Sequence, residues 1–571
     1  MLNRLVDYAR THVPLSESGF TVRDIRWRIE IANDGRLAGV IPLGDEKRGA
    51  ERWGCPEMHD MQSGGKAHFL IDNLKTILLL KAGASDKQRH DFYVARISDA
   101  ASQAPMLRGL ARLLSDTAGL EELRQTLLEP PHKAKPTDNL EWRIDGIDPL
   151  TEPAVRDWWK HWRLRDRDVD EDEMVCFVSG ETTTPAKIHP KVMGLPGGQG
   201  SGDALIGFDK EAFTSFGLKK STNAAVSEGA ARSYVDALNH LKRHHSKQLG
   251  EGLLLHWFRR AVVDDENILA WLHDPPEVAE ASAALAARRL FDAIRSGQRP
   301  DLASNEFYVL TVSGMAGRVM VRDWMEGDFK DLAGNIAAWF ADLAVVSRSG
   351  HEQAPDPKFM AVCGALVRDL KDLPAPTAAT LWKTAVQNLP IPQPLMSQAL
   401  MRFRIDIVNK DQPPISHARM GLIKAYFVRL KPGGDPTMTA YLNPDHPTAA
   451  YHCGRLMAVL AELQYSALGD VGAGVVQRYY AAASQTPGLI LGRLVRNAQN
   501  HLNKPDKPWL GPKYERPMMD IVSRLKDEFP RILDLEGQGL FALGYYQQLA
   551  ALRAGNKNAT SESITEHGEP K

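Results

Sequence analysis

The sequence predicts an α+β protein, in which a mixed α/β N-terminal region is followed by an all-α C-terminal helical bundle. Two observations carry this prediction. Over residues 1–345, short apolar runs typical of strands alternate with turn signals and helical segments. From Pro374 onward, helical segments are punctuated by proline pairs and glycines. A chain of 571 residues is also long enough for more than one hydrophobic core.

The strand candidates lie in the N-terminal region. In WRIEIANDGRLAGVIPL, the tripeptide Asn33-Asp34-Gly35 separates two apolar runs and indicates a hairpin turn. We expect further strands in MVCFVSG (174–180) and DALIGFD (203–209), and a pair of strands in FYVLTVSG and RVMVRDW around a glycine-containing turn. Helices are expected between these strands.

The C-terminal region is predicted to be helical throughout. In YHCGRLMAVLAELQYSAL (451–468), apolar residues recur every three or four positions and form one face, namely Leu456, Leu460, Leu463 and Ala467. This face predicts a helix packed in a bundle. The expected organisation is a mixed α/β region at 1–345, a linker at 346–373, the bundle at 374–555 and a polar, disordered tail at 556–571.

Composition limits the functional classes. The hydrophobic share of 43% and the charged share of 25% are those of an ordinary globular protein. No apolar run approaches about 18 residues, and the N-terminus lacks the apolar core of a signal peptide, so we expect a cytoplasmic protein with no membrane partner. No CxxC spacing is present, which argues against a disulfide framework or a zinc ribbon and fits a reducing compartment; the four cysteines are Cys55, Cys176, Cys363 and Cys453.

Charge points to nucleic acid only locally, because the net charge is -1. Two windows, 216–260 and 471–514, are basic. Such stripes are typical either of a solvated helix face or of a phosphate-binding track, and both interpretations stay open. The candidate DNA-backbone contacts in them are Lys219, Lys220, Arg478, Arg493, Arg496, Lys504 and Lys507.

The loop GLPGGQGSGDALIGFD (194–209) contains enough glycine for its backbone to approach a phosphate or a base closely. It has neither the GxxxxGK[ST] pattern of the P-loop nor the GxGxxG dinucleotide fingerprint. An ordinary mobile loop is the alternative. The tryptophans 158, 159 and 162 could likewise stack on bases, but we favour a core face.

Histidines offer no complete catalytic constellation. His240 and His244 share a helix face without the glutamate of HExxH, so exposed histidines on a basic helix are the better interpretation. Three His-Asp dyads keep a metal-dependent nuclease open as the alternative function, namely His59-Asp60, His90-Asp91 and His273-Asp274. We expect no catalytic residue, no bound metal and no cofactor.

Several segments, in the same order along most of the chain, resemble the large subunit of the type I-C CRISPR Cascade, a surveillance complex. The most specific is CFVSGETTTPAKIHPKVMGLPGGQGSGDALIGFDKEAFTSFG (176–217), followed by NAAV and YVDALNHL. The later segments are FYVLTVSGMAGRVMVRDW, YHCGRLMAVLAELQ, RYYAAASQTP and GLFALGYYQQ. HFLIDNLKTILL, near residue 70, is a weaker match.

The resemblance implies a subunit that is not an enzyme. Its expected partners are the crRNA-containing Cascade backbone, the crRNA-processing subunits, target double-stranded DNA and the helicase-nuclease. The subunit would recognise the protospacer-adjacent motif (PAM), aid R-loop formation and recruit the helicase-nuclease. The resemblance also implies that the helical region acts as a small-subunit-like bundle, which could additionally be translated from an internal start at Met420 or Met438.

The resemblance also gives roles to individual residues. The glycine-rich loop would enter a DNA groove, where the Gln199 amide can both donate to and accept from base edges. Asn223, at an expected helix start, would either contact DNA or cap the helix. The full set of expected PAM-loop contacts is Gly197, Gly198, Gln199, Gly200, Lys187, His189, Lys191, Asn223 and Asn73.

Overall fold

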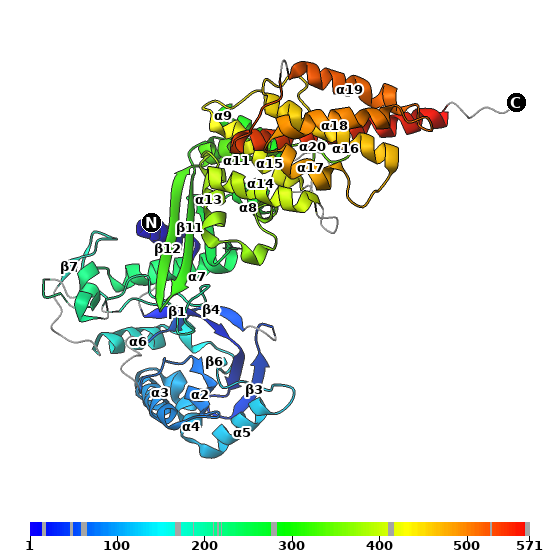
Figure 1. Cartoon of the computed structure of the whole chain (residues 1–571). Coiled ribbons are helices and arrows are strands. Elements are labelled where there is room, and N and C mark those ends of the chain that lie inside the picture. The colour runs from blue at the N-terminus through cyan, green and yellow to red at the C-terminus, as the bar shows by residue number, and fades with distance from the viewer. Residues whose placement is uncertain are drawn as a thin grey trace. The chain divides into compact units, whose positions relative to one another are not determined.

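The chain divides into two compact units (Figure 1). One unit comprises residues 1–246 and 312–322, and the other comprises 247–311 and 323–571. The hairpin of β11 (Glu306–Met315) and β12 (Arg318–Asp328) starts and ends in the second unit, while its turn belongs to the first. The computed structural model describes residues 1–571 except 14–18, 46–48, 59–64, 166–172, 187, 209, 214–215, 219, 276–282, 409–415, 526–527 and 566–571.

The first unit is built on a four-stranded sheet of order β3-β2-β6-β5. In it, β2 pairs antiparallel with β3 and parallel with β6. The predicted hairpin turn is confirmed, because Gly35 joins β2 to β3 with a φ of 96°. The strands of this unit are β1 (Phe20–Ile25), β2 (Trp27–Ile31), β3 (Leu37–Pro42), β4 (Ala50–Pro56), β5 (Asp72–Asn73), β6 (Asn139–Ile144), β7 (Met174–Val175) and β8 (Thr182–Thr183).

Helices cover this sheet and supply most of its core. Trp158 and Trp159 of α6 are buried, and the Trp159 indole donates a hydrogen bond to the Gly19 carbonyl at 2.9 Å. The core interpretation of the tryptophan cluster is therefore confirmed. The helices of the first unit are α1 (Leu2–His12), α2 (Leu74–Leu78), α3 (Ala84–Gln103), α4 (Arg108–Ser115), α5 (Thr117–Leu128), α6 (Pro153–Arg165) and α7 (Glu228–His244).

The second unit joins a small sheet to a helical bundle. Its sheet has the order β12-β11-β10-β9, with β9 at Ser246–Leu249 and β10 at Gly252–Phe258. Its helices are α8 (Ile268–His273), α9 (Ala283–Arg295), α10 (Pro300–Ala303), α11 (Phe329–Leu343), α12 (Phe359–Gly364), α13 (Ala375–Val386), α14 (Gln393–Val408), α15 (His417–Leu430), α16 (Ala449–Leu468), α17 (Val475–Ala483), α18 (Pro487–Leu502), α19 (Leu510–Arg524) and α20 (Leu535–Thr565).

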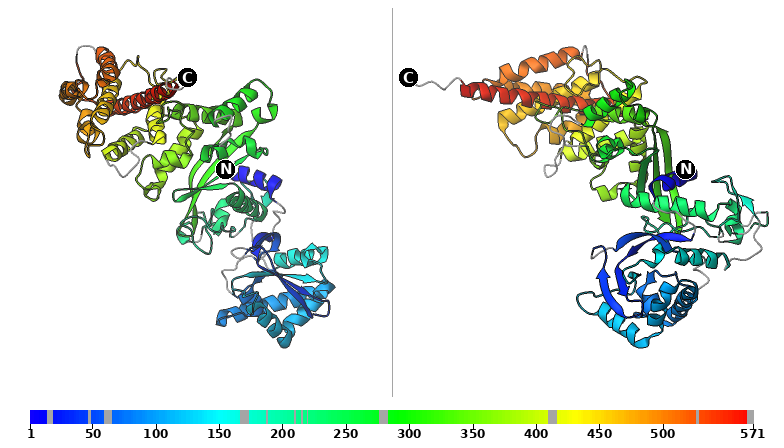
Figure 2. Two further views of the ribbon diagram at one scale, coloured as in Figure 1. Left: turned by 90° about the vertical axis from the view of Figure 1, so that its right-hand side faces the viewer. Right: turned by 180° about the vertical axis from the view of Figure 1, so that it is seen from behind.

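The predicted helix at 451–468 is α16, and its apolar face is buried as expected. It packs against α20, which both views of Figure 2 show in red among the orange and yellow helices. Glycines allow this close approach, because a Cβ on Gly454 would overlap the carbonyl oxygen of Phe541, and one on Gly544 would overlap that of Tyr451. The pair α16–α20 therefore forms the centre of the bundle.

The α+β class is confirmed, but several details differ from the sequence-based expectation. One continuous core runs from Leu249 to Ala550, so helices before residue 374 pack with those after it. The expected linker 346–373 contributes the buried Phe359 of α12 to that core. The expected disordered tail begins inside α20, which continues to Thr565. None of the helices described is long and apolar enough to cross a membrane.

Two of the expected strands are mostly absent. In the segment 203–209, the described residues 203–208 form no strand and take part only in isolated bridges, from Asp203 to Val192 and from Ala204 to Arg318. In the segment 174–180, only the two residues of β7 are paired. Both segments have strand-like composition, but their described residues have almost no neighbouring strand to pair with, and their backbone groups bond instead across turns and isolated bridges.

Candidate nucleic-acid interface

The glycine-rich loop is closed at its base by backbone hydrogen bonds. Val192 and Asp203 exchange two of them, at 2.8 and 2.9 Å. Inside the loop, Gly198 N–H donates to the Leu195 carbonyl and Gly202 N–H donates to that of Gln199, both at 2.9 Å. The loop therefore has a defined internal structure.

The closed loop is hydrogen-bonded to the turn of the β11–β12 hairpin. Gly314 N–H donates to the Pro196 carbonyl at 2.8 Å, and Ala204 N–H donates to the Gly317 carbonyl at 2.9 Å. Val319 N–H donates back to the Ala204 carbonyl at 3.0 Å. The loop and this turn, both in the first unit, form one surface that we call the loop–hairpin surface (residues 192–204 and 313–319).

Glycine occurs at the different positions of the loop for different structural reasons. Gly197 has a φ of 71°, and a Cβ there would lie 2.8 Å from the Gly314 carbonyl oxygen. A Cβ on Gly198 would overlap the Asp203 carboxylate, and one on Gly314 would overlap the Gly198 Cα atom. Gly200, in contrast, is exposed and has open space around it. The fold thus requires glycine at 197, 198 and 314, but not at 200.

Gln199 lies at the exposed tip of the loop, over the hairpin turn. Its side-chain oxygen would be 3.1 Å from a Cβ on Gly317, and its backbone N–H donates to the buried Asp203 carboxylate at 3.3 Å. Arg318, on the same turn, is exposed and lies with its guanidinium 4.9 Å from the centroid of the Phe213 ring. The tip therefore presents an amide side chain beside a cation on a hydrogen-bonded support.

The residues predicted to contact phosphates beside the loop differ in how far the structure exposes them. Lys191 is half-buried near the loop base, and Lys187 lies outside the described residues. His189 is only 2% exposed, with its Nδ1 atom 2.6 Å from the Tyr234 hydroxyl, and burial lowers its pKa to about 4. A buried, neutral imidazole does not present a charge to a phosphate, so His189 supports the fold in this structure.

The two asparagines have local structural roles. Asn73 is the N-cap of α2, where its side chain accepts a hydrogen bond from Thr76 N–H at 2.9 Å. Asn223 does not cap the following helix, as was one expectation. Ser227 caps α7 instead, and the Asn223 amide donates to the Leu218 carbonyl at 3.1 Å. Both residues are only partly buried, so contact with DNA stays a prediction for each.

The basic residues of the second window fall into an exposed group and a group that binds main-chain carbonyls. Arg478, Arg493 and Arg496 are exposed on α17 and α18. The ammonium groups of Lys504 and Lys507 instead donate to main-chain carbonyls at the end of α16, those of Ser466 and Ala467, at 2.9–3.0 Å. Lys219 and the Lys220 side chain lie outside what the structure describes.

The two His-Asp dyads that the structure describes each have local structural partners. Nδ1 of His90 lies 3.0 Å from the Ile77 carbonyl at the end of α2. His273 packs against Trp382 with its ring centroid 4.7 Å away, while Asp274 pairs with Lys358 at 2.6 Å. His59-Asp60 lies outside the described residues. Within the part of the chain that the structure describes, no group of three or more His, Cys, Asp or Glu side chains could hold a metal ion.

Sequence reasoning missed the hairpin turn as a part of this surface. The turn residues Met315, Ala316 and Arg318 are exposed, and the Lys242 ammonium group reaches the Met193 carbonyl at the loop base. The only local signal was Gly314, whose glycine identity indicates a close backbone approach without saying to which segment.

Comparison with known proteins identifies the family. The model of a CRISPR-associated protein family, Cas_Csd1, matches residues 3–553, which is nearly the whole chain. No curated protein matches the chain. Because the family match covers far more than half of the sequence, the chain belongs to the Cas_Csd1 family of CRISPR-associated proteins.

Proposed function

We propose that this chain is the large, non-catalytic subunit of a type I-C Cascade, and that it recognises the protospacer-adjacent motif of target DNA through the loop–hairpin surface. Membership of a CRISPR-associated family supports a role in a Cascade-type complex. In such complexes the guide RNA reads most of the target by base pairing, so a protein subunit needs to read only a few base pairs.

The observation that carries the proposal is the exposed tip Gln199-Gly200 on a support built of backbone hydrogen bonds. Reading a base edge requires a donor–acceptor side chain held in a fixed position, and an amide supplies both functions. The open space at Gly200 lets a groove wall come close. Arg318 and Lys191 would contact the flanking phosphates, which position the protein without reading sequence.

The remaining roles follow from the same proposal. The crRNA-containing backbone and processing subunits would hold the chain, and motif binding would start R-loop formation and recruit the helicase-nuclease. The helical second unit would act like a small subunit, with Arg478, Arg493 and Arg496 along the displaced strand. Met420 lies inside α15, whereas Met438 precedes α16, so an internal start at Met438 would give the intact helices α16–α20.

The test uses the assembled complex and duplexes with a matched or mutated motif. Gln199→Ala is expected to reduce the preference for the matched motif by about tenfold, since one good base contact contributes about 1–3 kcal/mol. Gln499→Ala, an exposed amide on α18, is the matched control and should keep the parent's preference. If Gln199→Ala discriminates the two duplexes as well as the parent does, the loop is not the reader.

A further inference from the structure

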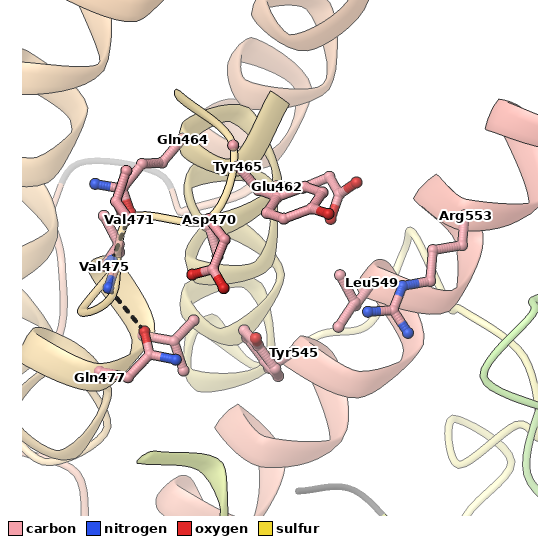
Figure 3. A pocket seen from close by; sticks show the side chains of 14 residues that line it. Glu462, Gln464, Tyr465, Asp470, Val471, Val475, Gln477, Tyr545, Leu549 and Arg553 are labelled. Atoms are coloured by element: carbon pink, nitrogen blue, oxygen red, sulfur yellow. Dashed lines mark hydrogen bonds between the residues drawn. The ribbon is translucent and has the colours of Figure 1, made fainter. Parts of the chain in front are cut away.

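A cavity of about 370 Å³ opens in the second unit between the end of α16, the start of α17 and one side of α20. Its volume is at the lower end of the range typical of small-molecule sites. Figure 3 shows its walls, with Asp470 pointing into the central space, Tyr545 below it, and Leu549 and Arg553 on the α20 side.

Tyr545 is the most buried polar side chain that lines the cavity. Tyr545 is 4% exposed, and in the described part of the structure its hydroxyl forms no hydrogen bond. The hydroxyl nevertheless reaches the cavity (Figure 3). Because the hydroxyl faces the cavity and is not engaged by a described side chain, it is available to donate a hydrogen bond to a ligand atom there.

Two charged side chains also line the cavity. Glu462 of α16 and Arg553 of α20 are both half-buried, and no ion pair is found for either among the described residues. Tyr465, one turn after Glu462, is 62% exposed at the rim. The cavity therefore combines a carboxylate, a guanidinium, a hydroxyl and an aromatic face.

The start of α17 does not serve as an anion site. Gln464 accepts a hydrogen bond from Val475 N–H at 2.6 Å, and Gln477 accepts one from Gly474 N–H at 2.9 Å. These two amides engage the N–H groups of the N-cap Gly474 and of Val475, the first residue of the helix. Since Asp470 adds a second negative charge beside Glu462, the interior of the cavity favours N–H donors over anions.

The surroundings of the cavity are basic. No acidic residue occurs between Asp470 and Asp506, a stretch that includes Arg478 directly after the cavity-lining Gln477. Burial raises the pKa of Tyr545, while the charge of Arg553 lowers it and that of Glu462 raises it, so both charged side chains of the cavity act on its hydroxyl. A ligand with N–H donors at one end and a negative group at the other fits this arrangement of acidic interior and basic rim.

We propose that this cavity binds one unpaired nucleobase of a nucleic-acid strand, with a preference for guanine. The N1–H and N2–H groups of guanine lie side by side and match the two oxygens of the Glu462 carboxylate. The Tyr545 hydroxyl donates to O6, Tyr465 stacks on the base, and Arg553 contacts the phosphate. The site lies in a different unit from the loop–hairpin surface and concerns single strands, so it goes beyond duplex motif recognition.

The experiment measures binding of the full chain to short thymidine oligomers that carry one central dG, one central deoxyinosine or no substitution. The parent chain should bind the dG oligomer about tenfold more tightly than the others, because inosine lacks the N2 donor and thymine lacks the adjacent donor pair. Glu462→Gln should reduce this preference to within about twofold. It should leave the melting temperature unchanged, since Glu462 has no ion-pair partner to lose among the described residues.

Glu515→Gln is the matched control, since it removes the same charge from an exposed site on α19 outside the cavity. It should keep the preference for dG. Equal binding of all three oligomers by the parent, or an unchanged preference in Glu462→Gln, would overturn the proposal. A third outcome would also overturn it: the Glu462→Gln variant binds every oligomer as the parent does but no longer joins the crRNA-bearing complex. The cavity would then hold a cationic side chain of a partner protein. Motif discrimination on duplexes is measured separately through Gln199→Ala, so either proposal can fail alone.

Discussion

The glycine-rich loop of the first unit and the basic stripe of the second both suggest DNA contact in the sequence, but the fold uses them differently. In the loop, most of the glycines serve backbone packing, and the tip that remains available consists of Gln199 and Gly200. In the stripe, the arginines remain exposed while Lys504 and Lys507 bind the end of α16.

The difference shows that residue type alone does not tell which groups are available for a ligand. A glycine or a lysine that the fold already uses cannot be altered without disturbing stability, whereas an exposed one can. The comparison therefore separates two kinds of substitution in each region: those that should change folding and those that should change binding.

The largest effect is expected at the backbone contact below the loop. In Gly314→Val, the new side chain would overlap Gly198 and approach the Asp203 carboxylate, so the loop and hairpin could no longer stay hydrogen-bonded. We expect a decrease of about 4 kcal/mol in the free energy of unfolding, at the upper end of what single substitutions cost. The measurement is unfolding in urea.

Gly200→Val is the control for this substitution, because its side chain would meet open space at an unstrained φ. It should keep the parent's stability and instead weaken binding of the matched duplex, where the groove wall comes close. If Gly200→Val destabilises the chain as much as Gly314→Val, the division of the loop into supporting glycines and an available tip is wrong.

The sequence predicts the local parts of this architecture well. The Asn33-Asp34-Gly35 turn, the β11–β12 hairpin and the apolar face of α16 depend on residues that are neighbours along the chain. Residues 203–208, the described part of an expected strand, form none because strand-like composition does not supply a pairing partner. The helix start at Ser227 rather than Asn223 is a similar case, since both residue types cap helices and the tertiary context decides.

The candidate surface was only half predictable. Gln199 and the glycines are visible in the sequence, but the hairpin turn that supports them is far away along the chain and meets them through backbone atoms. Such backbone interactions leave no side-chain signature. His189 shows the opposite failure, because its lysine-rich context indicates a surface position while packing against Tyr234 of α7 buries it.

A second test addresses His189 as a part of that support. Its pKa in the folded state is about 4, below the ordinary value of 6.5, so the unfolded chain binds the proton more readily. The contribution of the neutral His189 side chain to the free energy of unfolding is therefore fully present above about pH 6.5 and is lost as the pH falls toward 4. The difference between these pKa values corresponds to about 3 kcal/mol.

His189→Phe should remove this part of the acid-side decline in the free energy of unfolding, measured by urea titration between pH 7 and 4. At neutral pH it should cost only about 1 kcal/mol, because the hydrogen bond to Tyr234 is no longer formed. Tyr234→Phe removes the same hydrogen bond but keeps the buried imidazole, so its decline should match the parent's. An unchanged decline in His189→Phe would place this histidine at the surface.

The smallest effects are expected in the basic stripe, where paired double substitutions compare exposed and engaged cations. Arg493→Gln with Arg496→Gln should leave stability unchanged and reduce the slope of log affinity against log salt for single-stranded DNA, by about 0.7 for each phosphate that the variant no longer neutralises. Lys504→Gln with Lys507→Gln should do the reverse: stability falls by about 0.5–1 kcal/mol, because two cations leave the negative end of α16, while the salt slope stays near the parent's. Each double variant removes two positive charges, so net charge cannot explain a difference in salt slope or stability between the two variants. An equal reduction of the salt slope in both variants would mean that Lys504 and Lys507 leave the α16 carbonyls to bind DNA, and a parental slope in both would mean that the arginines do not contact it; either result would contradict the distinction between the arginines and the lysines of this stripe.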